Sequence, residues 1–145
     1  MNIFKRLFRI GQAEIHAAVD KMEGPVKMTE QGLRELPQDL AEATEAYAQV
    51  KALAIRTEND QAHCLQESTN YAEKAILIMQ KAQAGQVDMV KAEQLAREAL
   101  SLRRRFYTES EELGLQVVAL QQSSREMLRN TEILKENMEK WEKEL

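Results

Sequence analysis

Few side chains in this 145-residue sequence have the types and spacing that chemistry requires. His63 and Glu67 are four positions apart, so a helix would place them on one face, where they could supply two ligands to a metal ion. No further His or Cys stands at ligand spacing, which argues against a metal site. The sequence also has no glycine-rich phosphate loop and no Cys-x-x-Cys pair. We therefore predict that the chain is not an enzyme and that it holds neither a metal nor a cofactor.

Cys64 and three consecutive arginines are the remaining candidates for chemistry. A single cysteine excludes an intramolecular disulfide, and Cys64 is expected to be a small hydrophobe on a helix seam rather than a nucleophile. The arginines could contact a partner or a phosphate. Consecutive residues of a helix point in different directions, so a solvated face or ion pairs between hairpins is the favoured interpretation. These arginines are Arg103, Arg104 and Arg105.

The first ten residues, MNIFKRLFRI, combine five large apolar side chains with three cations. At 100° per residue the apolar side chains fall within an arc of about 160°, and the cations lie with Asn2 in a separate arc of about 100°. This separation predicts an amphipathic helix over residues 2–23 whose apolar face is concentrated in residues 3–10. The apolar face comprises Ile3, Phe4, Leu7, Phe8 and Ile10, and the cationic face comprises Lys5, Arg6 and Arg9.

Two uses are open to this helix. Its apolar face can insert into a membrane while the cations contact lipid phosphates, or it can pack against the rest of the chain or another subunit. The charge distribution favours the membrane, because residues 1–13 carry +3 and leave −7 on the rest of a chain of net charge −4. That net charge argues against a nucleic-acid partner. The cations interrupt any signal peptide, and no apolar run approaches the roughly 20 residues of a membrane span, so a soluble, cytoplasmic chain is expected.

The rest of the sequence predicts two long helices. Aromatic residues make up 5%, charged residues 30%, and there are only five Gly and two Pro, a composition typical of coiled coils. Pro25 ends the first helix and suits the start of the next, with Gly24 as its N-cap. Gly85 can close that helix, and Asp88 can cap the following one. We therefore predict an all-α fold with a membrane-binding helix at 1–23, a hinge at 24–25 and a long antiparallel coiled-coil hairpin at 26–145, with arms at 26–82 and 88–145 and a tip at 83–87.

A heptad seam runs along both predicted arms. Pro37 lies inside it and removes the hydrogen bond to the carbonyl of Leu33, which predicts a kink or, as the alternative, a break that leaves a separate helix at 26–36. Beside Gly114 the spacing takes one extra four-residue step, a stutter that would unwind the supercoil locally. The first seam is Leu33, Leu36, Leu40, Ala43, Tyr47, Val50, Ala54, Thr57, Gln61, Cys64, Ser68, Tyr71, Ala75, Ile78 and Ala82. The second is Ala92, Leu95, Ala99, Leu102, Phe106, Glu109, Leu113, Val117, Leu120, Ser124, Met127, Thr131, Leu134, Met138, Trp141 and Leu145.

Two stretches of the chain resemble a known family. "MNIFKRL" followed by "AAVDKMEGPVKMTEQGLREL" looks like the amphipathic first helix, the DKxExPxK hinge and the hairpin opening of the phage-shock protein A and vesicle-inducing protein in plastids family. The stretch "AQAGQVDMVKAEQLAREAL" is similar to the hairpin turn of that family. The matching residues are Asp20, Lys21, Glu23, Pro25, Lys27, Gln31, Arg34 and Glu35.

The resemblance implies an ESCRT-III-like membrane-remodelling protein of the stress response. Its first helix would bind anionic membrane lipids, and the hairpin would form homo-oligomers that maintain or remodel the inner membrane, as a peripheral protein on the inner face of the cytoplasmic membrane. An alternative from the same family is a soluble coiled-coil regulator that inhibits an AAA+ transcription activator. The resemblance further implies that Gly24 and Pro25 form a hinge and that Gln31, Arg34 and Glu35 are hairpin motif residues.

Overall fold

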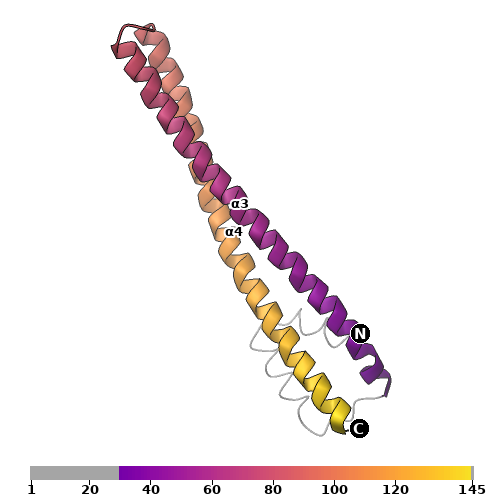
Figure 1. Ribbon diagram of the computed structural model, residues 1–145. Helices are drawn as coiled ribbons and strands as arrows, with labels where there is room; N and C mark the ends of the chain where they lie inside the picture. The colour runs from indigo at the N-terminus through magenta and orange to yellow at the C-terminus, as the bar shows by residue number, and fades with distance from the viewer. Residues whose placement is uncertain (1–29, 145) are drawn as a thin grey trace. The chain divides into compact units, whose positions relative to one another are not determined.

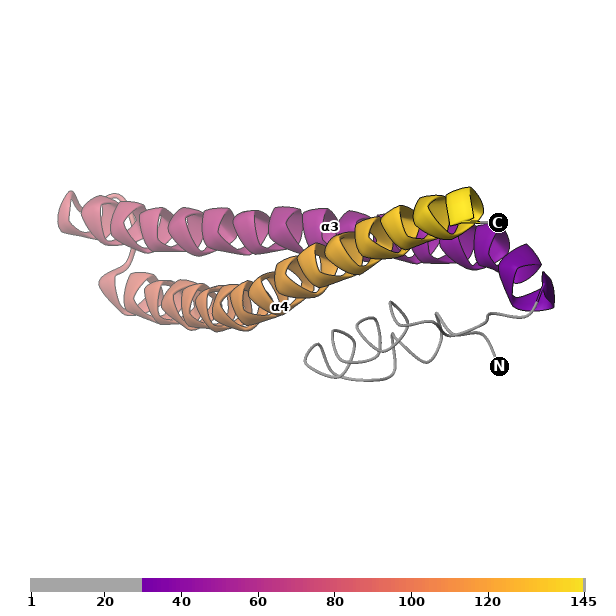
Figure 2. The ribbon, with the colours of Figure 1, turned by 90° about the horizontal axis from the view of Figure 1, so that it is seen from below.

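Two long helices make up the part of the chain that the computed structural model describes, residues 30–144. Helix α3 runs over Glu30–Gln83 and helix α4 over Met89–Glu144. They pack against each other in opposite directions (Figures 1 and 2), which confirms the predicted all-α antiparallel hairpin. The predicted amphipathic helix and hinge lie outside the described residues.

The hairpin divides into two compact units. The base unit contains α3 up to Leu53 and α4 from Leu120 onward, and the tip unit contains residues 54–119. The two units are described separately below, because each has its own core.

The turn between α3 and α4 depends on a glycine. Gly85 has a φ of 77°, in the left-handed region that glycine occupies without steric cost. The N–H of Gln86 donates to the carbonyl of Lys81 at 3.0 Å, the long bond of a Schellman motif. Asp88 then caps α4, because its Oδ2 accepts a hydrogen bond from the N–H of Lys91 at 3.3 Å. The predicted roles of Gly85 and Asp88 are confirmed.

The base unit has a core of large aliphatic side chains. Leu36 and Leu134 are 2% and 3% exposed, and they form one buried cluster with Ala43 and Met138. Leu40 and Trp141 are partly buried against it. Every residue of this cluster and its border was assigned to the seam from heptad spacing, so the pattern predicted the base-unit core correctly.

Pro37 lies within α3 without ending it. The helix is continuous from Glu30 to Gln83, so the alternative of a break beside Pro37 is wrong. An interior proline costs about 3 kcal/mol through the lost hydrogen bond and the ring clash. Leu36, which directly precedes it, is almost fully buried against α4, and this packing offsets much of that cost. A kink at Pro37 stays a prediction.

The core of the tip unit is built from small residues. Ala75, Ala96 and Ala99 form a buried cluster that Tyr71 and Met79 border. Because alanine side chains are small, two helix backbones can approach closely where they meet. Next to this cluster the rings of Tyr71 and Phe106 stack, with centroids 5.7 Å apart and planes 10° from parallel.

The predicted seam of α4 is wrong at two positions. Leu95 is 49% exposed and Glu109 is exposed, whereas their neighbours Ala96 and Ser110 are 7% and 2% exposed. With these replacements, four- and three-residue steps alternate from Phe106 past Gly114 to Trp141, so the stutter predicted beside Gly114 is not needed there. The irregular steps lie instead around Leu102, which is half-buried. The physical reason is that burial on a seam follows the phase of the heptad. The large apolar Leu95 set the wrong phase, and counting on from it placed the charged Glu109 on the seam.

The polar positions predicted on the α3 seam are correct. Thr57 and Ser68 are 6% and 5% exposed, and Gln61 is half-buried. Gln61 lies beside Gly114, where an added Cβ would come within 2.7 Å of the Gln61 Nε2. The glycine therefore provides the room that the longer amide side chain occupies.

Candidate functional site

Most residues predicted to carry the function lie outside the described part of the chain. Gln31 belongs to the first turn of α3, and Arg34 and Glu35 are exposed on the same helix. The described structure therefore places two of the three hairpin motif residues on the surface, away from the seam. The predicted residues outside it are the membrane-inserting Ile3, Phe4, Leu7, Phe8 and Ile10, the phosphate-contacting Lys5, Arg6 and Arg9, and the hinge residues Gly24 and Pro25.

Cys64 is a buried seam residue, as predicted. Burial raises the pKa of its thiol, and the carboxylates of Glu109, Asp60 and Glu67 raise it further by disfavouring a thiolate. The thiol therefore stays protonated at neutral pH, and a protonated thiol is a poor nucleophile.

The candidate metal pair does not form part of a larger ligand cluster. His63 is exposed, and Glu67 is half-buried one turn further along α3. Among residues 30–144, no group of three or more His, Cys, Asp or Glu side chains is placed to hold a metal ion.

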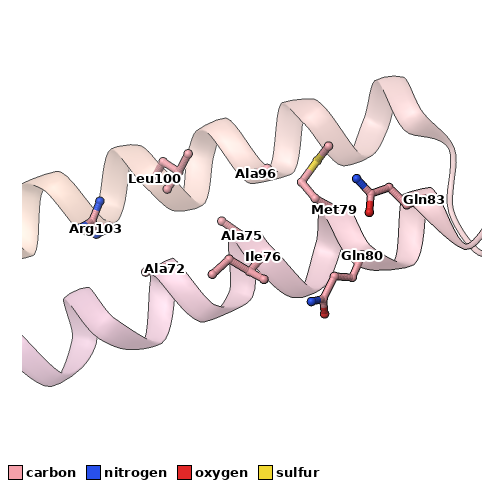
Figure 3. A pocket seen from close by; sticks show the side chains of 9 residues that line it. All are labelled: Ala72, Ala75, Ile76, Met79, Gln80, Gln83, Ala96, Leu100 and Arg103. Atoms are coloured by element: carbon pink, nitrogen blue, oxygen red, sulfur yellow. The ribbon is translucent and has the colours of Figure 1, made fainter.

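A shallow groove lies along one side of the tip unit (Figure 3). It has a volume of about 570 Å³ and is lined mainly by apolar side chains of both helices. Arg103 closes one end, while Gln80 and Gln83 lie toward the turn between the helices. Arg103 is the one charged residue in its lining. The remaining lining residues are Ala72, Ala75, Ile76, Met79, Ala96 and Leu100.

The sequence prediction did not identify this groove. The signal that could have found it is the heptad position just beside the seam, where Ala72, Met79 and Leu100 are apolar. Such positions usually carry charged residues in a two-stranded coiled coil. Arg103 lines the groove, whereas Arg104 and Arg105 do not. The sequence alone provided no reason to distinguish the three arginines.

The described helices are not membrane spans. None of those in residues 30–144 combines the length and the apolar character that crossing a bilayer requires.

The comparison with protein families decides what the chain is related to. The PspA/IM30 family matches residues 2–145. The chain belongs to the PspA/IM30 family. The resemblance noted in the sequence is thereby confirmed, and the match extends along the whole of α4.

Several curated proteins are distant relatives of this PspA/IM30 chain. It is 28% identical over 139 residues to the membrane-associated protein VIPP1, chloroplastic, of Arabidopsis thaliana, a match that covers 96% of this chain and 39% of the relative. It is 30% identical over 129 residues to the membrane-associated protein Vipp1 of Synechocystis, with 89% of this chain and 45% of the relative covered. The Vipp1 of Nostoc punctiforme is 31% identical over 110 residues, 76% of this chain and 39% of the relative.

The chain spans less than half the length of these relatives. No solved structure matches it. The predicted partners, namely anionic lipids, further copies of the chain and an AAA+ activator, are not tested by the hairpin geometry and stay predictions.

Proposed function

We propose that this chain is a peripheral membrane-binding scaffold of the stress response. Residues 2–23 form an amphipathic helix that binds anionic membrane lipids, and the hairpin behind it assembles with further copies to maintain or remodel the inner membrane. The relatives from Arabidopsis and Synechocystis are named membrane-associated proteins, which supports this assignment. The observation that carries it is the complete separation of apolar from cationic side chains in residues 2–10.

The expected energies favour reversible binding. Burying five large apolar side chains contributes at most roughly 1.5–3 kcal/mol each. Three cations contribute about 1 kcal/mol each near an anionic leaflet. Ordering the helix opposes binding by roughly 1–2 kcal/mol per residue. Because the ordering cost opposes the apolar and electrostatic gains, binding is expected to be reversible and to depend on the lipid charge.

The hairpin would keep the rest of the chain off the lipid surface. Beyond residue 13 the chain carries −7, so an anionic leaflet repels it while attracting the first helix. This charge distribution supports a location on the inner face of the cytoplasmic membrane, where anionic lipids are exposed to cytoplasmic proteins.

Flotation of the full chain with lipid vesicles tests the proposal. We expect the chain to float with vesicles rich in phosphatidylglycerol and to remain at the bottom of the gradient with phosphatidylcholine vesicles. Raising the salt concentration from 50 mM to 500 mM should weaken flotation, because it screens the three cations. Equal flotation with both lipids, or with neither, would contradict the proposal.

A further inference from the structure

One side of the tip unit is apolar where a two-helix hairpin normally carries charge. We define the apolar face as the exposed or half-buried residues that flank the seam on the side of the groove. Three of its members, Ile76, Leu100 and Tyr107, are 58%, 47% and 50% exposed. On the opposite flank, α3 carries the charged residues Asp60, Glu67, Lys74 and Lys81, whereas α4 carries Glu109 together with the apolar Leu95 and Leu102. The apolar face comprises Leu65, Ala72, Ile76, Met79, Leu100 and Tyr107.

The residues of α4 on this face are self-complementary about Tyr107. Leu100 precedes Tyr107 by seven positions, and Gly114 follows it by seven, so all three lie on one side of the helix. A second α4 running in the opposite direction, with Tyr107 opposite its counterpart, would place each Leu100 at the level of Gly114 of the other copy, where the Gln61 side chain also lies. The same arrangement places Arg104, three positions before Tyr107, within one residue of the level of Glu111, four positions after it.

The apolar residues of α3 on this face are also arranged symmetrically about the level of Tyr107. Tyr71 stacks on Phe106, so the level of Tyr107 on α4 lies close to residue 70 on α3. Ile76 lies six positions beyond that level, and Leu65 lies five positions before it. An antiparallel second copy would therefore bring its Leu65 to the groove beside Ile76. There the Leu65 side chain would contact the apolar residues that line the groove.

The charges of the tip unit select the same orientation. Residues 72–107, nearest the turn, hold seven cations and four carboxylates, a net charge of +3. The remainder of the unit, residues 54–71 and 108–119, holds one cation and six carboxylates, a net charge of −5. Antiparallel copies place each positive part against the negative part of the other, whereas parallel copies in register place like charges together. The N-terminal segment, at +3, would instead be repelled by Arg103 at the groove.

We propose that the apolar face of the tip unit binds the same face of a second copy of this chain, antiparallel and about a twofold axis at Tyr107. The inference deepens the proposed self-assembly, on which it rests, by assigning its first contact to a surface. Self-complementary surfaces of this kind form closed dimers. Arg104 and Glu111 form the ion pairs that fix the register, and each pair occurs twice because of the symmetry.

A charge exchange on the full chain tests the register. Arg104→Glu should raise the dimer dissociation constant at least tenfold in sedimentation equilibrium without lipid, and Glu111→Arg should do the same. The double variant, Arg104→Glu with Glu111→Arg, should return within a few-fold of the wild type. Arg105→Glu with Glu112→Arg is the matched control, since both residues are exposed and lie off the apolar face. Failure of the double variant to restore binding, or an equal effect of the control, would overturn the proposal.

Cross-linking tests the geometry independently of stability. In a Cys64→Ala background, Tyr107→Cys should form a disulfide-linked dimer under mild oxidation, because a residue on a twofold axis meets its own counterpart. Thr108→Cys, an exposed neighbour on the outer side of α4, should link far more slowly. Equal rates would overturn the proposed axis. Loss of the dimer in Phe4→Glu/Phe8→Glu but not in Arg104→Glu would show that the first helix occupies the groove instead, which also overturns it.

Vesicle flotation separates this inference from the proposed function. A chain that floats with anionic vesicles but shows none of the dimer effects supports membrane binding and contradicts the twofold interface. A chain that dimerises as described but does not float supports the twofold interface and contradicts the proposed membrane binding.

Discussion

Replacement of Phe4 and Phe8 by glutamate is expected to abolish flotation with anionic vesicles. Both rings belong to the proposed inserting face, and removing them forfeits at least about 3 kcal/mol of apolar burial. Since about 1.4 kcal/mol corresponds to a tenfold change in binding, the loss exceeds a hundredfold before any charge repulsion. Co-flotation with phosphatidylglycerol vesicles, quantified at several lipid concentrations, measures it.

The matched control adds the same two negative charges on the other side of the proposed helix. Asn2→Glu with Gln12→Glu leaves all five apolar residues and all three cations in place. It should weaken binding through charge alone, by about 1 kcal/mol per added carboxylate near the anionic surface, and should respond strongly to salt. Should the two double variants lose flotation equally, insertion of the apolar face would be the wrong explanation.

Leu134→Ala is expected to lower the free energy of unfolding of the base unit by about 2–5 kcal/mol. Leu134 is 3% exposed and lies in the cluster with Leu36, Ala43 and Met138. Removing three carbons there leaves a cavity that the long helices cannot collapse around freely. Urea titration followed by far-UV circular dichroism gives the change.

Leu128→Ala serves as the control for Leu134→Ala. It makes the same replacement on the same helix within the base unit, but at a side chain that is 38% exposed. Helix propensity changes equally in the two variants, so the difference between them reports the packing of the core. If Leu128→Ala destabilised the chain as much as Leu134→Ala, the cluster would not be the source of base-unit stability.

The fold followed from sequence where periodicity and turn chemistry agree. Gly85 and Asp88 identified the turn because the left-handed region and the N-cap each demand particular residue types. The α3 seam from Leu36 to Ala82 was predicted correctly throughout. The α4 seam was not, because its phase was set by Leu95 rather than by the less hydrophobic Ala96, and regular spacing then placed Glu109 rather than Ser110 on the seam. Where two helices meet through alanine side chains, the burial of a residue follows its position in the heptad rather than its hydrophobicity.

Of the two candidate surfaces, one could be derived from the sequence and the other, the groove, could not. The proposed membrane-binding face could be derived from the sequence, because its prediction needs only the periodicity of consecutive residues in one segment. The groove could not, because it depends on which sides of two helices share a face. That pairing is visible only once Ile76 and Met79 of α3 are seen to line one hollow with Leu100 of α4.

The most direct test of membrane binding reports where individual residues of the first helix lie. In the full chain with Cys64→Ala, an environment-sensitive fluorophore is attached to Phe8→Cys or to Asn2→Cys, one on each proposed face. With anionic vesicles we predict a blue shift at position 8, with quenching by a nitroxide on the lipid acyl chain, and little of either at position 2. Equal responses at both positions, or none at position 8 in vesicle-bound protein, would contradict insertion through residues 3–10.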